Sequence, residues 1–370
     1  MLEKKVEACS GCAAPLSHQD LGGRLFLGFP TDRSLRQVLR HLEGEGHVYR
    51  HLEEAHCIWL AVAPGLHGTV MDALDAALRP EVQEEIRALF LTGHDEPVLS
   101  DFARVASLKE LIVRSQSRWL LDLLLHERLT SHFQPIVHAH DTSRIFAHEA
   151  LMRGVEPDGR LVFPNRILDL ARRADLIDQL DLLARRTAIR EARRHGIDRH
   201  VFINFNPGGI DDPAVSLRST IQAVDEAQIP RDRVVFELVE SDHTRDLAHL
   251  KAIVAYWRDA GFSVALDDLG AGHSTLNLLH QLRPDYVKLD MALIRDVHLD
   301  PYKALITGKI LEIAQQLDIR TVAEGVEVPE ELEWIREHGA TFVQGYLIAK
   351  PAHPPVSATP LIPHRQSKSA

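Results

Sequence analysis

Five acidic residues each come at or near the end of a short apolar run that is typical of a β-strand. They are Glu149, Glu237, Asp267, Asp268 and Glu324. A single acidic residue in that position is usually a helix N-cap or a solvated loop residue. Five of them, accompanied by the amide of Asn204 and the amine of Lys288, are harder to explain that way.

Grouped carboxylates repel one another, and cations relieve the repulsion. Oxygen ligands without a nearby Cys or His pattern favour Mg²⁺ or Mn²⁺ over zinc. The adjacent pair Asp267 and Asp268 suits two ions close together, because one carboxylate can bridge while the other holds the second ion. Two such ions lower the pKa of a shared water and stabilise the entering and leaving oxygens when a phosphodiester is cleaved in line.

The alternation of the strands predicts which side chains converge. Residues 263, 265 and 267 share one face of their run, which puts Asp267 on the face with two small residues. Lys288 lies between two apolar neighbours that would face outer helices, and Asn204 ends its own run. We therefore expect Asn204, Asp267 and Lys288 to point to the inside of a barrel.

The elements that would position these residues begin at Phe133. Short β-rich runs alternate with helical patterns, and the eight runs are Phe133–His138, Ile145–Leu151, Val201–Asn206, Val234–Val239, Phe262–Asp267, Tyr286–Asp290, Thr321–Glu324 and Phe342–Leu347. Eight strands with interleaved helices over about 220 residues predict a (β/α)₈ TIM-like barrel. Only residues 139–144 separate the first two runs, so the first strand should be antiparallel to the second.

The residues before the barrel predict a small α/β domain. Arg24–Phe29 and Cys57–Val62 are predicted as strands, and Ser34–Glu43, His67–Leu78 and Glu81–Phe90 as helices. Residues 105–129 contain no Gly or Pro and predict a long amphipathic helix. That helix could transmit a signal or pair with a copy of itself, or it could be a linker packed on the barrel.

The predicted organisation has four parts, each with a different composition. They are an N-terminal sensor or interaction module at 1–103, a linker helix at 104–130, the barrel at 131–352 and a Pro- and Ser-rich disordered tail at 353–370. The fold class is α/β: a barrel with an antiparallel first strand, preceded by a small α/β N-terminal domain and a linker helix.

Composition narrows the possible functions. The formal net charge of −11 argues against broad DNA or RNA binding, which needs a surplus of Lys and Arg. The N-terminus has no signal-peptide core, and the longest apolar stretch, Cys57–Ala63, is too short to insert into a membrane. We expect a cytoplasmic protein, in keeping with its three cysteines.

Two features of the N-terminal part remain open. Cys9 and Cys12 have metal-ligand spacing, but a second Cys pair is missing, so an ordinary terminal segment is favoured over a zinc site or a redox dithiol. The histidines at 41, 47, 51 and 56 are interpreted as surface residues, although a ligand-sensing role is conceivable.

At the acidic residues the sequence resembles the EAL-domain phosphodiesterases of cyclic di-GMP, over about residues 120–351. Seven motifs carry the resemblance in the family's order: Glu149-Ala-Leu-Met-Arg153 with Phe133-Gln134-Pro135 before it, Asn204 in Ile-Asn-Phe-Asn-Pro, Glu237 and Glu240 in Phe-Glu-Leu-Val-Glu-Ser, Asp267-Asp268-Leu-Gly270-Ala-Gly272-His-Ser, Lys288 in Val-Lys-Leu-Asp, Ala-Glu324-Gly-Val-Glu, and Gln344-Gly-Tyr.

The resemblance implies metal-dependent hydrolysis of cyclic di-GMP to linear pGpG. It assigns the first metal to Glu149, Asn204, Glu237 and Asp267, and the second to Asp267 and Asp268. The implied catalytic residues are Glu324, as base or water-orienting group, and Lys288. The implied substrate-binding residues are Arg153, Gln134 and Gln344, and Glu240, Gly270 and Gly272 support the loop that couples the metal site to a homodimer interface on the barrel.

Two positions of that loop depart from the family pattern. Leu269 stands where Phe is usual, and His273 where Tyr is usual. Both changes leave the aspartates and glycines in place, so they bear on loop packing or dimer coupling rather than on the metal ligands. The alternative function is a non-catalytic cyclic di-GMP receptor that signals through the N-terminal module. Such receptors typically lose a ligand or the base, and none is lost here.

Overall fold

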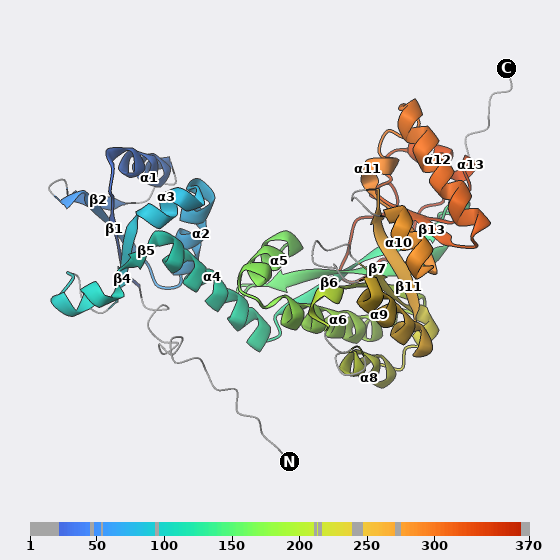
Figure 1. Cartoon of the computed structure of the whole chain (residues 1–370), viewed down its shortest axis with the longest axis horizontal. Coiled ribbons are helices and arrows are strands. Elements are labelled where there is room, and N and C mark those ends of the chain that lie inside the picture. The colour runs from blue at the N-terminus through green and yellow to red at the C-terminus, as the bar shows by residue number, and fades with distance from the viewer. Residues whose placement is uncertain are drawn as a thin grey trace, which may run out of the picture. The chain divides into compact units, whose positions relative to one another are not determined.

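The computed structural model describes residues 22–44, 48–52, 55–92, 96–210, 213, 217–238, 247–270 and 275–363. The chain forms two compact units, residues 1–122 and 123–370 (Figure 1). Among the described helices, none is both long and apolar enough to cross a membrane.

The N-terminal unit contains a five-stranded sheet in the order β2-β3-β1-β4-β5. Its elements are β1 (Gly23–Gly28), α1 (Asp32–Gly44), β2 (Tyr49–Leu52), β3 (Cys57–Val62), α2 (His67–Ala77), α3 (Pro80–Glu85), β4 (Arg87–Leu91), η2 (Leu99–Arg104) and β5 (Ala106–Ser107). All strand pairs are antiparallel. The βαββαβ chain order with this strand order is the ferredoxin-like arrangement.

One predicted helix of this unit is wrong. The sequence pattern indicated a helix over Glu81–Phe90, but α3 ends at Glu85 and residues 87–91 form β4. β4 pairs with β1, and Phe90 lies opposite Leu25 in a buried core. Short apolar runs do not distinguish helix from strand, so pairing with a partner strand decided the conformation.

Helix α4 (Leu108–Leu125) replaces the longer helix expected over 105–129. Its first turns belong to the N-terminal core, because Leu108 and Ile112 are buried in the same cluster as β1 and α2. One turn later, Gln116 Nε2 donates to Asp75 Oδ2 at 2.9 Å. This half of α4 is therefore an integral part of the first unit.

The second unit is the predicted barrel with an antiparallel first strand. Its strands are β6 (Leu129–His138), β7 (Ile145–Val155), β8 (Leu161–Val162), β9 (His200–Phe205), β10 (Val234–Leu238), β11 (Ser263–Leu269), β12 (Tyr286–Leu289), β13 (Arg320–Ala323) and β14 (Phe342–Val343). From β7 through β9 to β14 the neighbours are parallel, whereas β6 is antiparallel to both β7 and β14 and closes the barrel. β8 extends the sheet beside β7.

Helices surround these strands and bury one face on them (Figure 1). They are α5 (Pro164–Arg173), α6 (Ile177–Arg194), α8 (Arg218–Glu226), α9 (Leu247–Asp259), α10 (Thr275–Leu282), α11 (Met291–Ile294), α12 (Pro301–Gln316) and α13 (Pro329–Glu337), with short 3₁₀ turns at η3 (Pro207–Gly209) and η4 (Arg231–Arg233). α12 shows why one of them begins where it does. Asp300 accepts hydrogen bonds from two backbone N–H groups of the first turn, and Pro301 occupies the first helical position.

The interior of the barrel has two layers. The lower, apolar layer is a buried cluster made of Ile136, Ala147, Phe202, Val235, Ala265, Tyr286, Val322 and Phe342. The other layer is polar and is made of Gln134, Glu149, Asn204, Glu237, Asp267, Lys288, Glu324 and Gln344. Each residue of this polar layer is two positions in the sequence from a residue of the apolar layer. Because side chains two residues apart share a strand face, the apolar layer forms a dry base under the polar one.

The C-terminal segment was expected to be a disordered tail, and for residues 353–363 that expectation is wrong. The buried hydroxyl of Thr142 donates to Pro360 O at 2.6 Å and accepts from Ile362 N at 2.8 Å. The guanidinium of Arg336 donates to Ile362 O at 2.7 Å. A Pro- and Ser-rich composition disfavours helix and strand, but it does not prevent an irregular chain from packing. Residues 364–370 lie outside the described residues.

Candidate active site

The ammonium of Lys288 lies at the centre of the polar layer. Its Nζ atom is 2.6 Å from Glu324 Oε1, 2.8 Å from Glu237 Oε1, 3.1 Å from Asp267 Oδ1 and 3.4 Å from Glu149 Oε1. Its side chain is 2% exposed and that of Glu237 is fully buried. Burial alone would lower the pKa of Lys288, but the surrounding carboxylates raise it well above its usual value, so Lys288 is protonated.

One ammonium does not neutralise the carboxylates around it. Burial, together with the charges of Glu149 and Asp267, raises the pKa of Glu237 well above its usual range. Burial and neighbouring carboxylates also raise the pKa of Glu324 to about 8, although Lys288 opposes the change. The pKa of Asp268 rises to about 6, through burial and the charge of Asp267. The cluster therefore carries an excess of negative charge that protons or cations must balance.

Glu149 differs from these residues because amides hold it as a carboxylate. Gln344 Nε2 donates to its Oε2 at 2.6 Å, and Asn204 Nδ2 donates to its Oε1 at 3.3 Å. Burial would raise the pKa of Glu149, but Lys288 and these amides outweigh burial and lower it. Gln134 in turn accepts from Gln344 Nε2 and donates to Ala349 O, both at 3.1 Å.

The donor set fits divalent cations that prefer oxygen ligands. One oxygen from each of Asp267, Asp268 and Glu324 lies within 4.8 Å of the others. In the described part of the chain, Oε2 of Glu237 is buried without a hydrogen-bond partner. A buried carboxylate oxygen without a partner is costly, and a cation would satisfy it. The residues present therefore suit Mg²⁺ or Mn²⁺.

Asp268 and Gly270 shape the end of β11. Asp268 has a φ of +54° and Gly270 a φ of +111°, both in the left-handed region. Left-handed backbone is uncommon for a residue other than glycine and clusters at functional sites. Leu269 is buried between them in the barrel core. Gly272, His273 and Glu240 lie outside the described residues, as do Cys9 and Cys12.

Arg153, the predicted phosphate ligand, lies four residues beyond Glu149 on β7. Its Nη1 atom donates to Met152 O at 2.7 Å, and its guanidinium lies 5.4 Å from the centre of the Phe163 ring. Burial lowers its pKa, while Tyr346 and Glu149 oppose that shift. The arginine is therefore held on β7 by a backbone carbonyl and an aromatic ring, and within the described residues no ion pair to a carboxylate is found for it.

Sequence reasoning missed two residues of α6 that hold the chain just after β9, the strand that carries Asn204. Asp181 on α6 accepts a hydrogen bond from Asn206 N at 3.1 Å, just past the end of β9, and pairs with Arg185 at 3.1 Å. Both side chains are largely buried. Their only signal in the sequence is an i,i+4 acid–base pair on a helix, which is too common to stand out.

Comparison with known proteins gives a consistent result for the second unit. A family model described as the EAL domain matches residues 117–351. The chain is 29% identical over 246 residues to the probable cyclic di-GMP phosphodiesterase PdeB of Escherichia coli, covering 64% of this chain and 45% of PdeB. It is also 29% identical over 252 residues to the cyclic di-GMP phosphodiesterase NbdA of Pseudomonas aeruginosa, covering 66% of this chain and 32% of NbdA. The chain thus spans less than half the length of these two relatives.

Solved structures agree. A standalone EAL protein from Vibrio cholerae, solved in a c-di-GMP bound form, is 35% identical with a TM-score of 0.57, covering 62% of this chain and 95% of that one. The PaMucR phosphodiesterase in complex with c-di-GMP is 27% identical with a TM-score of 0.57, covering 64% and 96% of the two chains. The fold, the order of the polar residues and these matches lead to one conclusion: this chain belongs to the EAL domain family.

Proposed function

We propose that this protein is a phosphodiesterase that hydrolyses cyclic di-GMP to linear pGpG and so lowers the level of a second messenger. The observation that carries the proposal is the complete polar layer, in which Lys288 contacts four carboxylates at one end of the barrel. Its relatives PdeB and NbdA are named as cyclic di-GMP phosphodiesterases, the former as a probable one.

The cations would be held by residues that already converge. Glu149, Asn204, Glu237 and Asp267 are the proposed ligands of one ion, and Asp267 with Asp268 of a second. Bound Mg²⁺ or Mn²⁺ would make a nucleophile available at neutral pH and stabilise charge on the phosphate oxygens. Lys288 keeps the carboxylates in register through its four contacts, which prepares the site before any substrate arrives.

Glu324 is the proposed proton acceptor. Its pKa of about 8 lies close to neutral pH, so the ionised carboxylate is basic enough to take a proton from water. Lys288, 2.6 Å away, stabilises the ionised form when the proton leaves. Arg153 is the proposed ligand of a substrate phosphate, since a guanidinium can make two parallel hydrogen bonds to it.

A homodimer through the barrel is part of the proposal. The exposed apolar residues of α11 and α12 support it: Met291, Tyr302, Leu305 and Ile306. Large apolar side chains left exposed on neighbouring elements are candidates for a protein interface. This surface is close to the metal site in the fold, because the space beside Gly270 is filled by Leu293 of α11. In sedimentation velocity, Leu305→Glu should shift the protein toward monomer, and a fully active wild-type monomer would contradict this part.

The function is tested by incubating purified protein with cyclic di-GMP and Mg²⁺ or Mn²⁺ and separating the nucleotides by chromatography. We expect pGpG from the wild type and none from Glu149→Ala or Glu324→Gln. Glu226→Gln, at an exposed position on α8 away from the proposed interface, is the matched control and should keep full turnover. Tight binding of cyclic di-GMP without turnover would instead establish the non-catalytic receptor.

A further inference from the structure

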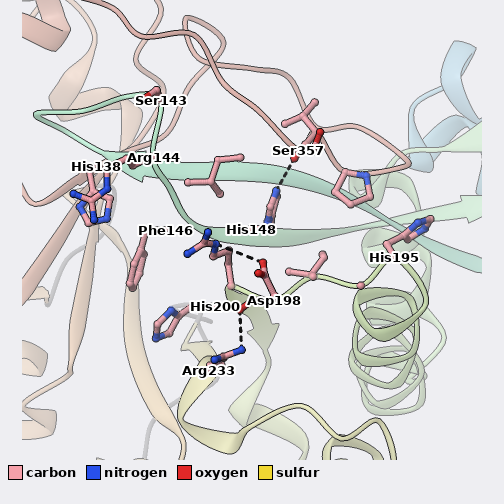
Figure 2. A pocket seen from close by; sticks show the side chains of 16 residues that line it. His138, Ser143, Arg144, Phe146, His148, His195, Asp198, His200, Arg233 and Ser357 are labelled. Atoms are coloured by element: carbon pink, nitrogen blue, oxygen red, sulfur yellow. Dashed lines mark hydrogen bonds and ion pairs between the residues drawn. The ribbon is translucent and has the colours of Figure 1, made fainter.

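A cavity lies at the other end of the barrel from the polar layer. It has a volume of about 590 Å³ and lies around the N-terminal ends of β7, β9 and the turn before β10. Figure 2 shows His148, His200, Asp198 and Arg233 around it. Cavities of roughly 300–1,000 Å³ are typical of small-molecule sites.

The apolar layer separates this cavity from the polar layer. Phe146, which lines the cavity, stacks on Phe342 of that layer with ring centres 3.9 Å apart. His200 also stacks on Phe146, with ring centres 4.4 Å apart. His200 is thus the last ring of a stack, and it lines the cavity. A ligand in this cavity would not compete for the residues proposed for catalysis.

The charge of the cavity lining is opposite to that of the chain. Three arginines, Arg144, Arg199 and Arg233, line it with one carboxylate, Asp198, although the chain has a formal net charge of −11. Arg199 pairs with Asp198 at 3.4 Å, whereas Arg233 Nη1 donates to the backbone carbonyl of Asp198 at 2.8 Å. Within the described residues no ion pair to a carboxylate is found for Arg144 or Arg233.

The histidines that line the cavity contribute neutral imidazole rings rather than positive charges. Four histidines line it, and burial is the main cause that lowers the pKa of each, so His138, His148, His195 and His200 are neutral near neutral pH. His148 has a structural task, because its Nε2 atom lies 3.1 Å from Val356 O and holds residues 355–357 as one wall of the cavity. The segment expected to be a disordered tail therefore completes the cavity.

We propose that this cavity is a second ligand site, which binds a small phosphate-bearing anion of about mononucleotide size. The guanidinium of Arg144 or of Arg233, which line the cavity, would bind the phosphate, since arginine matches phosphate oxygens with two parallel N–H groups. The exposed face of the ring stack at His200 would receive a planar group. Two ligands carry the phosphate that the arginines would bind: a nucleoside monophosphate or free inorganic phosphate.

The test is calorimetric titration of the full chain with 5′-GMP and, separately, with inorganic phosphate. Excess cyclic di-GMP and EDTA are present throughout, so that the polar layer cannot account for the signal. We expect saturable binding of at least one probe, and an affinity at least tenfold lower for the double variant Arg144→Gln/Arg233→Gln. Arg114→Gln removes one positive charge from an exposed position on α4 and should bind like the wild type.

The two probes distinguish the sources. Tighter binding of 5′-GMP than of phosphate supports a nucleotide with its ring at His200, and equal binding supports free phosphate. Arg144→Gln alone guards against a folding defect in the double variant, because in the described part of the chain the Arg144 side chain makes no hydrogen bond or ion pair; it should bind the probe more weakly than the wild type while melting at the same temperature. Absence of binding by both probes at millimolar concentration overturns the proposal, as does equal binding by wild type and a folded double variant.

Discussion

Lys288 Nζ lies 2.8 Å from Glu237 Oε1, and the two side chains are almost completely buried at the centre of the barrel. Lys288 is also bonded to three other carboxylates, so it is the electrostatic centre of the polar layer. Removing one partner of a buried ion pair leaves the other charge without compensation, which typically costs about 3–5 kcal/mol.

Lys288→Met should therefore lower the free energy of unfolding by about 3–5 kcal/mol in EDTA at neutral pH, as measured by urea denaturation. Divalent cations should recover part of that loss, because they supply positive charge to the same carboxylates. Lys309→Met removes an exposed lysine paired with Glu312 at 2.7 Å and should change stability by less than about 0.5 kcal/mol. Similar losses for the two variants would refute the central role of Lys288.

Binding of Mn²⁺ or Mg²⁺ should stabilise the second unit and not the first. A single bound ion at a hundredfold excess over its dissociation constant adds about 2.7 kcal/mol to the free energy of unfolding. Asp267→Asn removes the carboxylate proposed to serve both ions, so its melting temperature should not respond to the metal. Glu312→Gln, an exposed acidic residue on α12, should respond like the wild type. A metal-dependent shift of equal size in Asp267→Asn would show that the ions bind elsewhere.

Gly345 and Gly308 offer a matched pair of glycine-to-alanine changes. A Cβ on Gly345 would lie 2.0 Å from Val326 O and 2.4 Å from Val326 N, so the backbone beside Gln344 must move. We expect Gly345→Ala to destabilise the barrel by about 1–3 kcal/mol and to impair turnover. Gly308 lies inside α12, where an added Cβ would meet its nearest neighbour at 3.5 Å. Gly308→Ala should stabilise the protein by about 0.5–1 kcal/mol, and denaturation curves of both variants would show whether the signs are opposite.

His67 predicts a pH dependence of the N-terminal unit. Burial, with a smaller effect of Arg118, lowers its pKa to about 4 from an unfolded value of 6.5. The unfolded chain therefore binds a proton that the folded unit excludes, so the contribution of His67 to stability is complete above pH 6.5 and is lost as the pH falls toward 4. The loss should reach on the order of 3 kcal/mol at the acidic end.

The comparison is between wild type and His67→Asn, with unfolding of the N-terminal unit followed from pH 7 downward. Their difference in stability should be constant at neutral pH and shrink in acid, because asparagine does not titrate. His51→Asn on the edge strand β2 keeps a titrating histidine at 67 and should follow the wild type. Parallel profiles for wild type and His67→Asn would contradict the prediction.

The sequence alone predicted the barrel, its antiparallel first strand, and the positions of Asn204, Asp267 and Lys288 on interior strand faces. These are local properties, since alternation with a period of two decides the face and a short connection decides the direction. The family membership also follows from short motifs, which can be identified in the sequence without any knowledge of contacts.

Only the tertiary structure decided what those residues do to one another. The four contacts of Lys288, and the dry layer two residues below the polar one, depend on the register of strands that are far apart in the chain. The same holds for β4, which became a strand because β1 was available to pair with it. Residues 353–363 also depend on distant contacts, because they have no regular pattern of their own. Thr142 holds them from 218 residues away in the chain, and Arg336 from 26 residues away. Long-range pairing and burial set these features, and no window of sequence contains them.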